Sequence, residues 1–134
     1  MRIFVAGATG VLGRRAVASL IAAGHDVTGI ARTPAKAAEL RAQGASPVEV
    51  SMFDPDALRA AVAGHDAVVN LATKIPPLSR AARDSAWAEN TRIRVEGSRN
   101  LVDAAIAAGA QVFVQESIAF QYGEHGAEWI DAAQ

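Results

Sequence analysis

Short apolar runs alternate with alanine-rich stretches of helical periodicity along most of the chain, and this alternation constrains the fold more than any other feature. Apolar strands that are linked by helices are typically buried on both faces, in a parallel sheet with right-handed crossovers. The sequence therefore predicts an α/β doubly wound parallel sheet of about five strands in the order 3-2-1-4-5, with helices on both faces. The expected strands are residues 2–6, 26–31, 47–52, 66–72 and 111–115, and the expected helices are residues 11–23, 34–43, 55–63 and 82–108.

Composition narrows the class of protein. A chain of 134 residues has the size of one domain, and 51% hydrophobic residues with a net charge of -1 fit a globular protein. The small charge gives no electrostatic reason to expect nucleic acid or an anionic membrane as a partner. Cysteine is absent, so neither a disulfide framework nor a thiolate metal site is expected. His25, His65 and His125 lack metal-ligand spacing and are expected to be solvated loop residues. We expect no metal and a cytoplasmic location.

A glycine-rich turn joins the first strand to the first helix, with the sequence Gly7-Ala8-Thr9-Gly10-Val11-Leu12-Gly13. Glycine lacks the Cβ that would keep a ligand away from the backbone, so amide groups can face a pyrophosphate. The helix that follows adds the partial positive charge of its N-terminus, and Gly13 allows that helix to pack closely on the strand. The turn therefore predicts a dinucleotide site at Gly7, Thr9, Gly10, Val11, Leu12 and Gly13, although a purely structural turn is the alternative.

The chain resembles the short-chain dehydrogenase/reductase superfamily, and most closely its extended branch of NAD-dependent epimerase/dehydratase proteins. The resemblance rests on the G-x-x-G-x-x-G spacing of the turn, on DAVVNLAT at residues 66–73, on VEGSRNLVDAAIAAG at residues 95–109 and on VFVQESIAFQYG at residues 112–123. It covers nearly the whole chain, and several separate motifs agree. It implies a Rossmann fold and an NAD(P)-dependent oxidoreductase or epimerase activity.

The end of the second strand indicates which dinucleotide binds. NAD-specific proteins carry an acidic side chain there for the adenine ribose, whereas this sequence has Arg32. A guanidinium can form a paired hydrogen bond with a 2′-phosphate, so we expect NADP(H) to be preferred over NAD(H). Arg14 or Arg15 could assist, although both are more simply explained as surface arginines. A solvated arginine beside a helix start is also the alternative explanation of Arg32.

Further cofactor contacts are expected at the carboxyl ends of the third and fourth strands. Asp54 follows the third strand and either lies near the adenine or only caps the next helix. Leu71, Ala72 and Thr73 follow the fourth strand and are expected to line the ribose and nicotinamide side. Asn70 either faces the cofactor or forms hydrogen bonds in the core.

The resemblance also implies a catalytic group, of which only one part is evident. Ser117 matches the serine that polarises the substrate after the fifth strand, although it could equally cap a loop. The tyrosine-x-x-x-lysine pair of the superfamily is missing, because Tyr122 is followed four residues later by Gly126. Relatives often have asparagine where this chain has Arg94; Asn90 could replace it, but a surface asparagine is the simpler interpretation.

These observations predict an NAD(P)-binding domain over residues 1–116 and the start of an incomplete substrate segment over residues 117–134. We expect the NADP(H)-binding part of an oxidoreductase or epimerase that stops before the catalytic pair, acting on an unknown small-molecule substrate. The alternative is a non-catalytic NADP(H)-sensing module. The face of the last helix that carries Leu101 and Ala105 is expected to be exposed, so a homo-oligomer is predicted.

Overall fold

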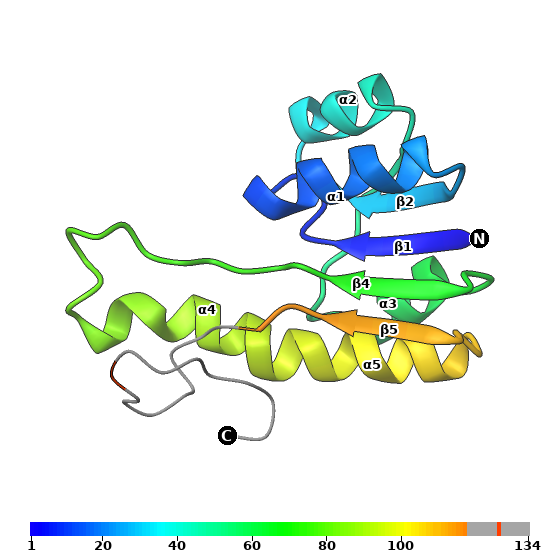
Figure 1. Ribbon diagram of the computed structural model, residues 1–134. Helices are drawn as coiled ribbons and strands as arrows, with labels where there is room; N and C mark the ends of the chain where they lie inside the picture. The colour runs from blue at the N-terminus through cyan, green and yellow to red at the C-terminus, as the bar shows by residue number, and fades with distance from the viewer. Residues whose placement is uncertain (118–125, 127–134) are drawn as a thin grey trace.

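The computed structural model describes residues 1–117 and residue 126, and within them the chain forms a single five-stranded sheet. The strands are β1 (Arg2–Ala6), β2 (Asp26–Ile30), β3 (Ser46–Val48), β4 (Ala67–Asn70) and β5 (Val112–Gln115). All neighbouring strands are parallel, and their order is β3-β2-β1-β4-β5 (Figure 1). The predicted fold class and strand order are therefore confirmed.

Helices cover both faces of this sheet, as Figure 1 shows. Helices α1 (Val11–Ala22) and α2 (Pro34–Ala42) lie on one face, and α3 (Pro55–Val62) and α5 (Ser98–Ala107) lie on the other. The short helix α4 (Ala88–Arg92) precedes α5 in the chain. Each face has its own core. The first core includes Ile3, Val5, Val17, Val27 and Leu40, and the second includes Phe4, Leu58, Val62, Val68 and Leu101. Alternate residues of β1 and β4 point into opposite cores, as the pleat of a strand requires.

Side-chain caps fix the starts of two helices where the sequence predicts them. Thr33 Oγ1 accepts a hydrogen bond from the Lys36 amide at 3.3 Å and begins α2. Asp54 Oδ1 accepts one from the Ala57 amide at 3.0 Å and begins α3. A proline at the first helical position follows each cap, where its missing amide proton costs nothing.

The third strand is shorter than predicted, since it ends at Val48 rather than at Met52. Within residues 1–117 its only partner is β2, and the last paired residue of β2 is Ile30. Beyond that point the chain turns, with the Phe53 amide donating to Ser51 Oγ at 3.1 Å. Val50 is buried without being in the sheet, which explains why its apolar character suggested a longer strand.

The single long helix predicted for residues 82–108 is wrong in detail. A 3₁₀ turn at Asp84–Trp87 leads into α4, and a π-helical segment at Ile93–Gly97 separates α4 from α5. A π-helical segment shifts the register of the side chains, and such segments are often found at functional sites. Gly97, the last residue of this segment, packs against the Met52 side chain. A Cβ on Gly97 would lie 3.3 Å from the end of that side chain.

Three side chains lie deeper in the protein than the sequence suggested. Leu101 and Ala105 are 0% and 4% exposed, because their face of α5 packs on the sheet and on α3. His65 is also buried, with Nδ1 3.0 Å from the Val62 carbonyl oxygen and Nε2 2.9 Å from Thr28 Oγ1. The expectations of an exposed Leu101 face and of a solvated His65 are therefore wrong.

Among the described residues, no helix combines the length and the apolar character that crossing a membrane requires.

Candidate functional site

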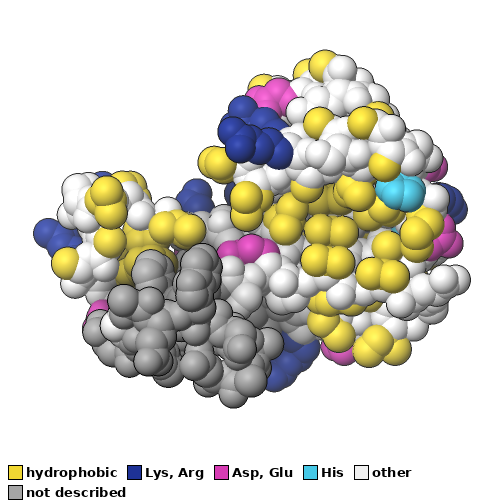
Figure 2. Space-filling model, viewed as in Figure 1, with side chains coloured by type: hydrophobic (Ala, Val, Ile, Leu, Met, Phe, Trp, Pro, Cys, Tyr) yellow, Lys and Arg dark blue, Asp and Glu magenta, His cyan; other side chains and the backbone are white. Residues whose placement is uncertain are grey.

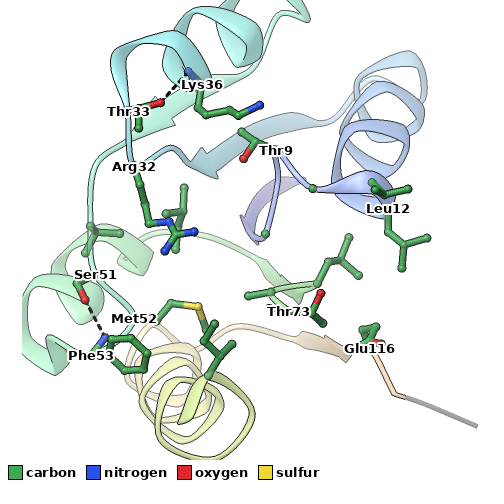
Figure 3. Close-up of a pocket in the computed structure, with 18 of the residues that line it drawn as sticks. Thr9, Leu12, Arg32, Thr33, Lys36, Ser51, Met52, Phe53, Thr73 and Glu116 are labelled. Atoms are coloured by element: carbon green, nitrogen blue, oxygen red, sulfur yellow. Dashed lines mark hydrogen bonds between the residues drawn. The ribbon is translucent and has the colours of Figure 1, made fainter. Parts of the chain in front are cut away.

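One cavity of about 810 Å³ extends along the carboxyl ends of the strands, where ligands bind in doubly wound sheets. In Figure 2 the surface is hollowed between helices α1 and α2 and the projecting segment that follows β4. The cavity has two ends. The β3 end is formed by Arg32, Thr33, Lys36, Glu49 and residues 51–53, and the β5 end by Thr73 and Glu116 (Figure 3). Ile75 and Ile93 also line the cavity.

The glycine-rich turn lies between these two ends. Gly7 has a φ of 76°, and a Cβ on it would lie 2.5 Å from the carbonyl carbon of Leu71, so neither the backbone conformation nor the space admits a larger residue. A Cβ on Gly13 would overlap the Gly7 carbonyl oxygen. Gly10 is the N-cap of α1 and has no side chain to cap the first turn. The first amides of α1 are therefore available to an anion in the cavity.

The β3 end of the cavity carries two cations. Arg32 is exposed and follows β2, and Lys36 lies one helical turn later in α2. Lys36 Nζ donates to both oxygens of Glu39, at 2.8 and 3.1 Å. This hydrogen bond holds the pKa of Glu39 below its ordinary value. Arg14 Nε donates to the Thr9 carbonyl oxygen at 3.2 Å, and neither Arg14 nor Arg15 lines the cavity.

Ser51, Met52 and Phe53 form a wall of the β3 end that depends on distant helices. The Arg92 guanidinium lies over the Phe53 ring at 3.8 Å from its centre, which is a cation–π contact. Asn100 Nδ2 donates to the Met52 carbonyl oxygen at 2.9 Å. Asp54 caps α3 and is not among the residues that line the cavity, so its position fits the capping alternative.

The end of β4 is fixed by a buried amide. Asn70 is 0% exposed, and its Nδ2 donates to Ser98 Oγ at 3.0 Å and to Gln115 Oε1 at 2.9 Å. Its Oδ1 accepts from the Ala72 amide at 3.2 Å, which orients the backbone just before Thr73. Of the two alternatives for Asn70, the core role is the one the structure supports.

Asn90 has a similar part in the segment after β4. Its side chain is 6% exposed, and its Oδ1 accepts from the Lys74 amide at 2.8 Å. Asn90 is therefore a buried support of this segment, and the interpretation as a surface asparagine is wrong.

At the end of β5 the cavity meets Glu116 rather than Ser117. Glu116 lines the cavity, and Arg94 Nη1 donates to its Oε2 at 2.8 Å. Ser117 is exposed and does not line the cavity. Tyr122 lies outside the described residues.

The structure brings most of the predicted cofactor residues together, since Gly7, Thr9, Gly10, Val11, Leu12, Arg32, Leu71, Ala72 and Thr73 all line the cavity. Gly13 acts in helix packing instead. Sequence reasoning missed several lining residues, namely Lys36, Glu49, Ser51, Met52, Phe53, Ile75, Ile93 and Glu116. Of these, Lys36 could have been found, because it follows Arg32 by one helical turn.

Comparisons with known proteins agree with this geometry. A family profile described as NAD(P)H-binding matches residues 7–132. A 3-diazoavenalumate denitrifying reductase from a Streptomyces species is 38% identical over 133 residues, which is 98% of this chain and 42% of the relative. The chain thus spans less than half the length of that curated relative.

Solved structures show the same fold. A UDP-glucose 4-epimerase from Stenotrophomonas maltophila with bound NAD has a TM-score of 0.78 at 23% identity, over 95% of this chain and 40% of that one. An NADPH-dependent quinone oxidoreductase from Escherichia coli, solved with NADPH, has a TM-score of 0.64 at 28% identity, over 84% of this chain and 35% of that one.

The glycine turn and the cavity over the strand ends thus define a dinucleotide-binding Rossmann protein. The chain belongs to the NAD(P)H-binding family, within the extended short-chain dehydrogenase/reductase superfamily of epimerases and reductases.

Proposed function

We propose that this chain is the cofactor-binding domain of an NADP(H)-dependent oxidoreductase that acts on a small molecule, and that it prefers NADP(H) to NAD(H). The observation that carries the preference is the pair of cations, Arg32 and Lys36, at the β3 end of the cavity. Both lie beyond the carboxyl end of β2, where an adenine ribose would be held. Two cations there favour a ribose with a 2′-phosphate over one with a free hydroxyl.

This placement orients the dinucleotide. With the 2′-phosphate near Arg32, the amides of the glycine turn would hold the pyrophosphate, and residues 51–53 would enclose the adenine. The nicotinamide would then lie at the β5 end, against Thr73. When bound, it supplies a hydride to the substrate or accepts one from it. The described residues bind and orient the cofactor, and their apolar side chains keep water from the ring.

The names of the relatives support an oxidoreductase over the other classes in the superfamily. The Streptomyces relative is a reductase, and the Escherichia coli protein is an NADPH-dependent oxidoreductase.

Self-association remains a prediction. The apolar side chains that could mediate it are Val95, Val102 and Ile106, which are exposed on the π segment and α5.

The preference is tested by titration calorimetry of Arg32→Ala with NADPH and NADH. Losing a charge-assisted phosphate contact costs about 1.5–3 kcal/mol, so the affinity for NADPH should fall about tenfold or more. The affinity for NADH should stay within about twofold, because NADH has no 2′-phosphate. Arg15→Ala is the matched control, since Arg15 is an exposed arginine of α1 that does not line the cavity. An unchanged ratio of the two affinities in Arg32→Ala would show that Arg32 does not select the cofactor.

A further inference from the structure

The β5 end of the cavity contains an ion pair that the proposed function does not use. Arg94 lies in the π segment and Glu116 directly follows β5, and their side chains are 21% and 14% exposed. The backbone of Glu116 is fixed as well, because its amide donates to the Asn70 carbonyl oxygen at 3.0 Å. Its carbonyl oxygen accepts from Gln115 Nε2 at 2.9 Å. The position of the Glu116 carboxylate is therefore determined on several sides.

The two charges of this pair do not face the cavity equally. Glu116 is one of the residues that line the cavity, whereas Arg94 is not. Arg94 binds Oε2 of the carboxylate, and Oε1 receives no hydrogen bond from the residues that the structure describes. In Figure 3 Glu116 lies beside Thr73, on the far side of the cavity from Arg32. A ligand at this end therefore meets the Glu116 carboxylate directly, whereas the Arg94 guanidinium is not part of the cavity wall.

We propose that Glu116 is a specificity-determining residue that favours the oxidised, positively charged nicotinamide over the neutral reduced ring, and that Arg94 is its positioning residue. This inference rests on the proposed function, because that function places the nicotinamide at the β5 end. An oxidised ring carries one positive charge and a reduced ring carries none. A fixed carboxylate at the cavity wall therefore stabilises the oxidised form through its charge, while the adenosine, the pyrophosphate and the riboses are the same in the two forms.

The consequence is a shift in the redox balance of the bound cofactor. A site that binds NADP⁺ better than NADPH lowers the reduction potential of the bound pair, by about 30 mV for each tenfold difference in a two-electron couple. Bound NADPH is then a stronger hydride donor than free NADPH. Because bound NADPH is the stronger donor, the carboxylate suits reduction rather than oxidation of the substrate. It also favours the binding of hydride acceptors that carry a positively charged group.

The test compares the Kd of NADP⁺ with the Kd of NADPH by calorimetry, in the wild type and in Glu116→Gln. We expect Glu116→Gln to weaken NADP⁺ by about threefold to tenfold and to change NADPH by less than about twofold. Glu49→Gln is the matched control, because Glu49 also lines the cavity but lies at the β3 end. It can change both affinities, but it should leave their ratio unchanged.

Arg94→Gln separates a charge effect from a structural one. Glutamine can still donate to the carboxylate but does not neutralise it, so the preference for NADP⁺ should rise by about threefold. A fall of the preference in both Arg94→Gln and Glu116→Gln would overturn the proposal, since it would mean that breaking the pair only disturbs the local structure. An unchanged ratio in Glu116→Gln would overturn it too.

A nucleotide without the nicotinamide keeps this test distinct from that of the proposed function. Adenosine 2′,5′-bisphosphate should bind the wild type, Glu116→Gln and Arg94→Gln with equal affinity. If it binds but the NADP⁺ to NADPH ratio does not respond to Glu116→Gln, only the present inference fails. If neither it nor NADP(H) binds the wild type, the proposed function fails.

Discussion

The glycine turn and the β5 end of the cavity are built in different ways. At the turn the backbone itself forms the surface, and its shape depends on residues that are close in sequence. For example, the Gly10 amide donates to the Gly7 carbonyl oxygen at 3.0 Å. At the β5 end the surface consists of side chains from the segments that follow β4 and β5, and Arg94 of the π segment supports one of them. Its ion pair joins residues 22 positions apart, and the Asn70 to Gln115 hydrogen bond joins residues 45 positions apart.

This difference has a physical consequence. A backbone cradle suits a phosphate, because amide groups and a helix N-terminus bind any anion of the right size. A wall of side chains can change chemically without changing the fold, because each residue is replaced separately. The turn therefore fits a ligand part that is common to all the dinucleotides, and the β5 end fits the part that differs between reactions.

The largest effect is expected from valine in the glycine turn. In Gly10→Val the new Cβ would lie 3.2 Å from the Gly7 carbonyl oxygen, which must move by a few tenths of an ångström, and Gly10 has extended backbone angles that other residues adopt. The branched side chain would occupy the space that the pyrophosphate needs, so the affinity for NADPH should fall more than about a hundredfold. Calorimetry measures the affinity, and circular dichroism checks the fold.

Gly13→Val provides the contrast within the same turn. Its Cβ would overlap the Gly7 carbonyl oxygen and lie 2.7 Å from the Ala8 carbonyl carbon, both of which are backbone atoms that cannot move away cheaply. This variant should lose the fold together with binding. If Gly10→Val keeps near wild-type affinity with its fold intact, the turn is not the phosphate cradle.

The next largest effect is expected at the β5 end, from Asn70→Ala. This change leaves Gln115 Oε1 and the Ala72 amide without their partner and creates a cavity beside a fully buried position. The free energy of unfolding should fall by about 2–4 kcal/mol, as measured by urea denaturation. Ser98→Ala removes only one member of the network and should cost about 1 kcal/mol. Equal costs for the two variants would contradict the central role of Asn70.

The same contrast explains how much of the protein could be predicted from its sequence. The strands, the helix caps at Thr33 and Asp54, and the glycine turn depend on local patterns, and the structure confirms them. Strand order followed from the general behaviour of parallel sheets rather than from any single residue. Arg32 was found because it directly follows a predicted strand.

The residues that were missed depend on contacts between distant segments. Met52 and Phe53 line the cavity because Asn100 and Arg92, on another part of the chain, hold them there. The role of Glu116 depends on the π segment, which turns Arg94 toward the end of β5. A helical repeat in the sequence does not reveal such a segment, because its shift in register is set by tertiary packing.

The smallest effect is expected at the β3 end, from Glu39→Gln. Lys36 lines the cavity, but Glu39 binds its ammonium group through both carboxylate oxygens, at 2.8 and 3.1 Å. Removing the carboxylate frees Lys36 for a 2′-phosphate and removes a negative charge that would repel one. We therefore expect NADPH to bind about two- to threefold more tightly, in keeping with the modest strength of exposed ion pairs. NADH, which lacks the 2′-phosphate, should change less, and an equal change for both would mean that Lys36 does not contact the phosphate.

The pH dependence of this difference provides an independent check. The hydrogen bond from Lys36 lowers the pKa of Glu39 from its ordinary value of 4.5, so the carboxylate stays charged at neutral and weakly acid pH. Because the pKa of Glu39 is lowered, the Lys36–Glu39 ion pair is fully formed when the pH is above the ordinary pKa of 4.5. The ion pair is lost as the pH falls through the lowered pKa of the folded protein. The advantage of Glu39→Gln over the wild type should therefore persist down to about pH 5 and vanish in more acid solution. The 2′-phosphate itself takes up one proton at about pH 6, which weakens its interaction with Lys36 and makes the advantage smaller, but the phosphate keeps one negative charge and the advantage does not disappear. An advantage that vanished above about pH 5 would point to a group other than Glu39 as the one that restrains Lys36.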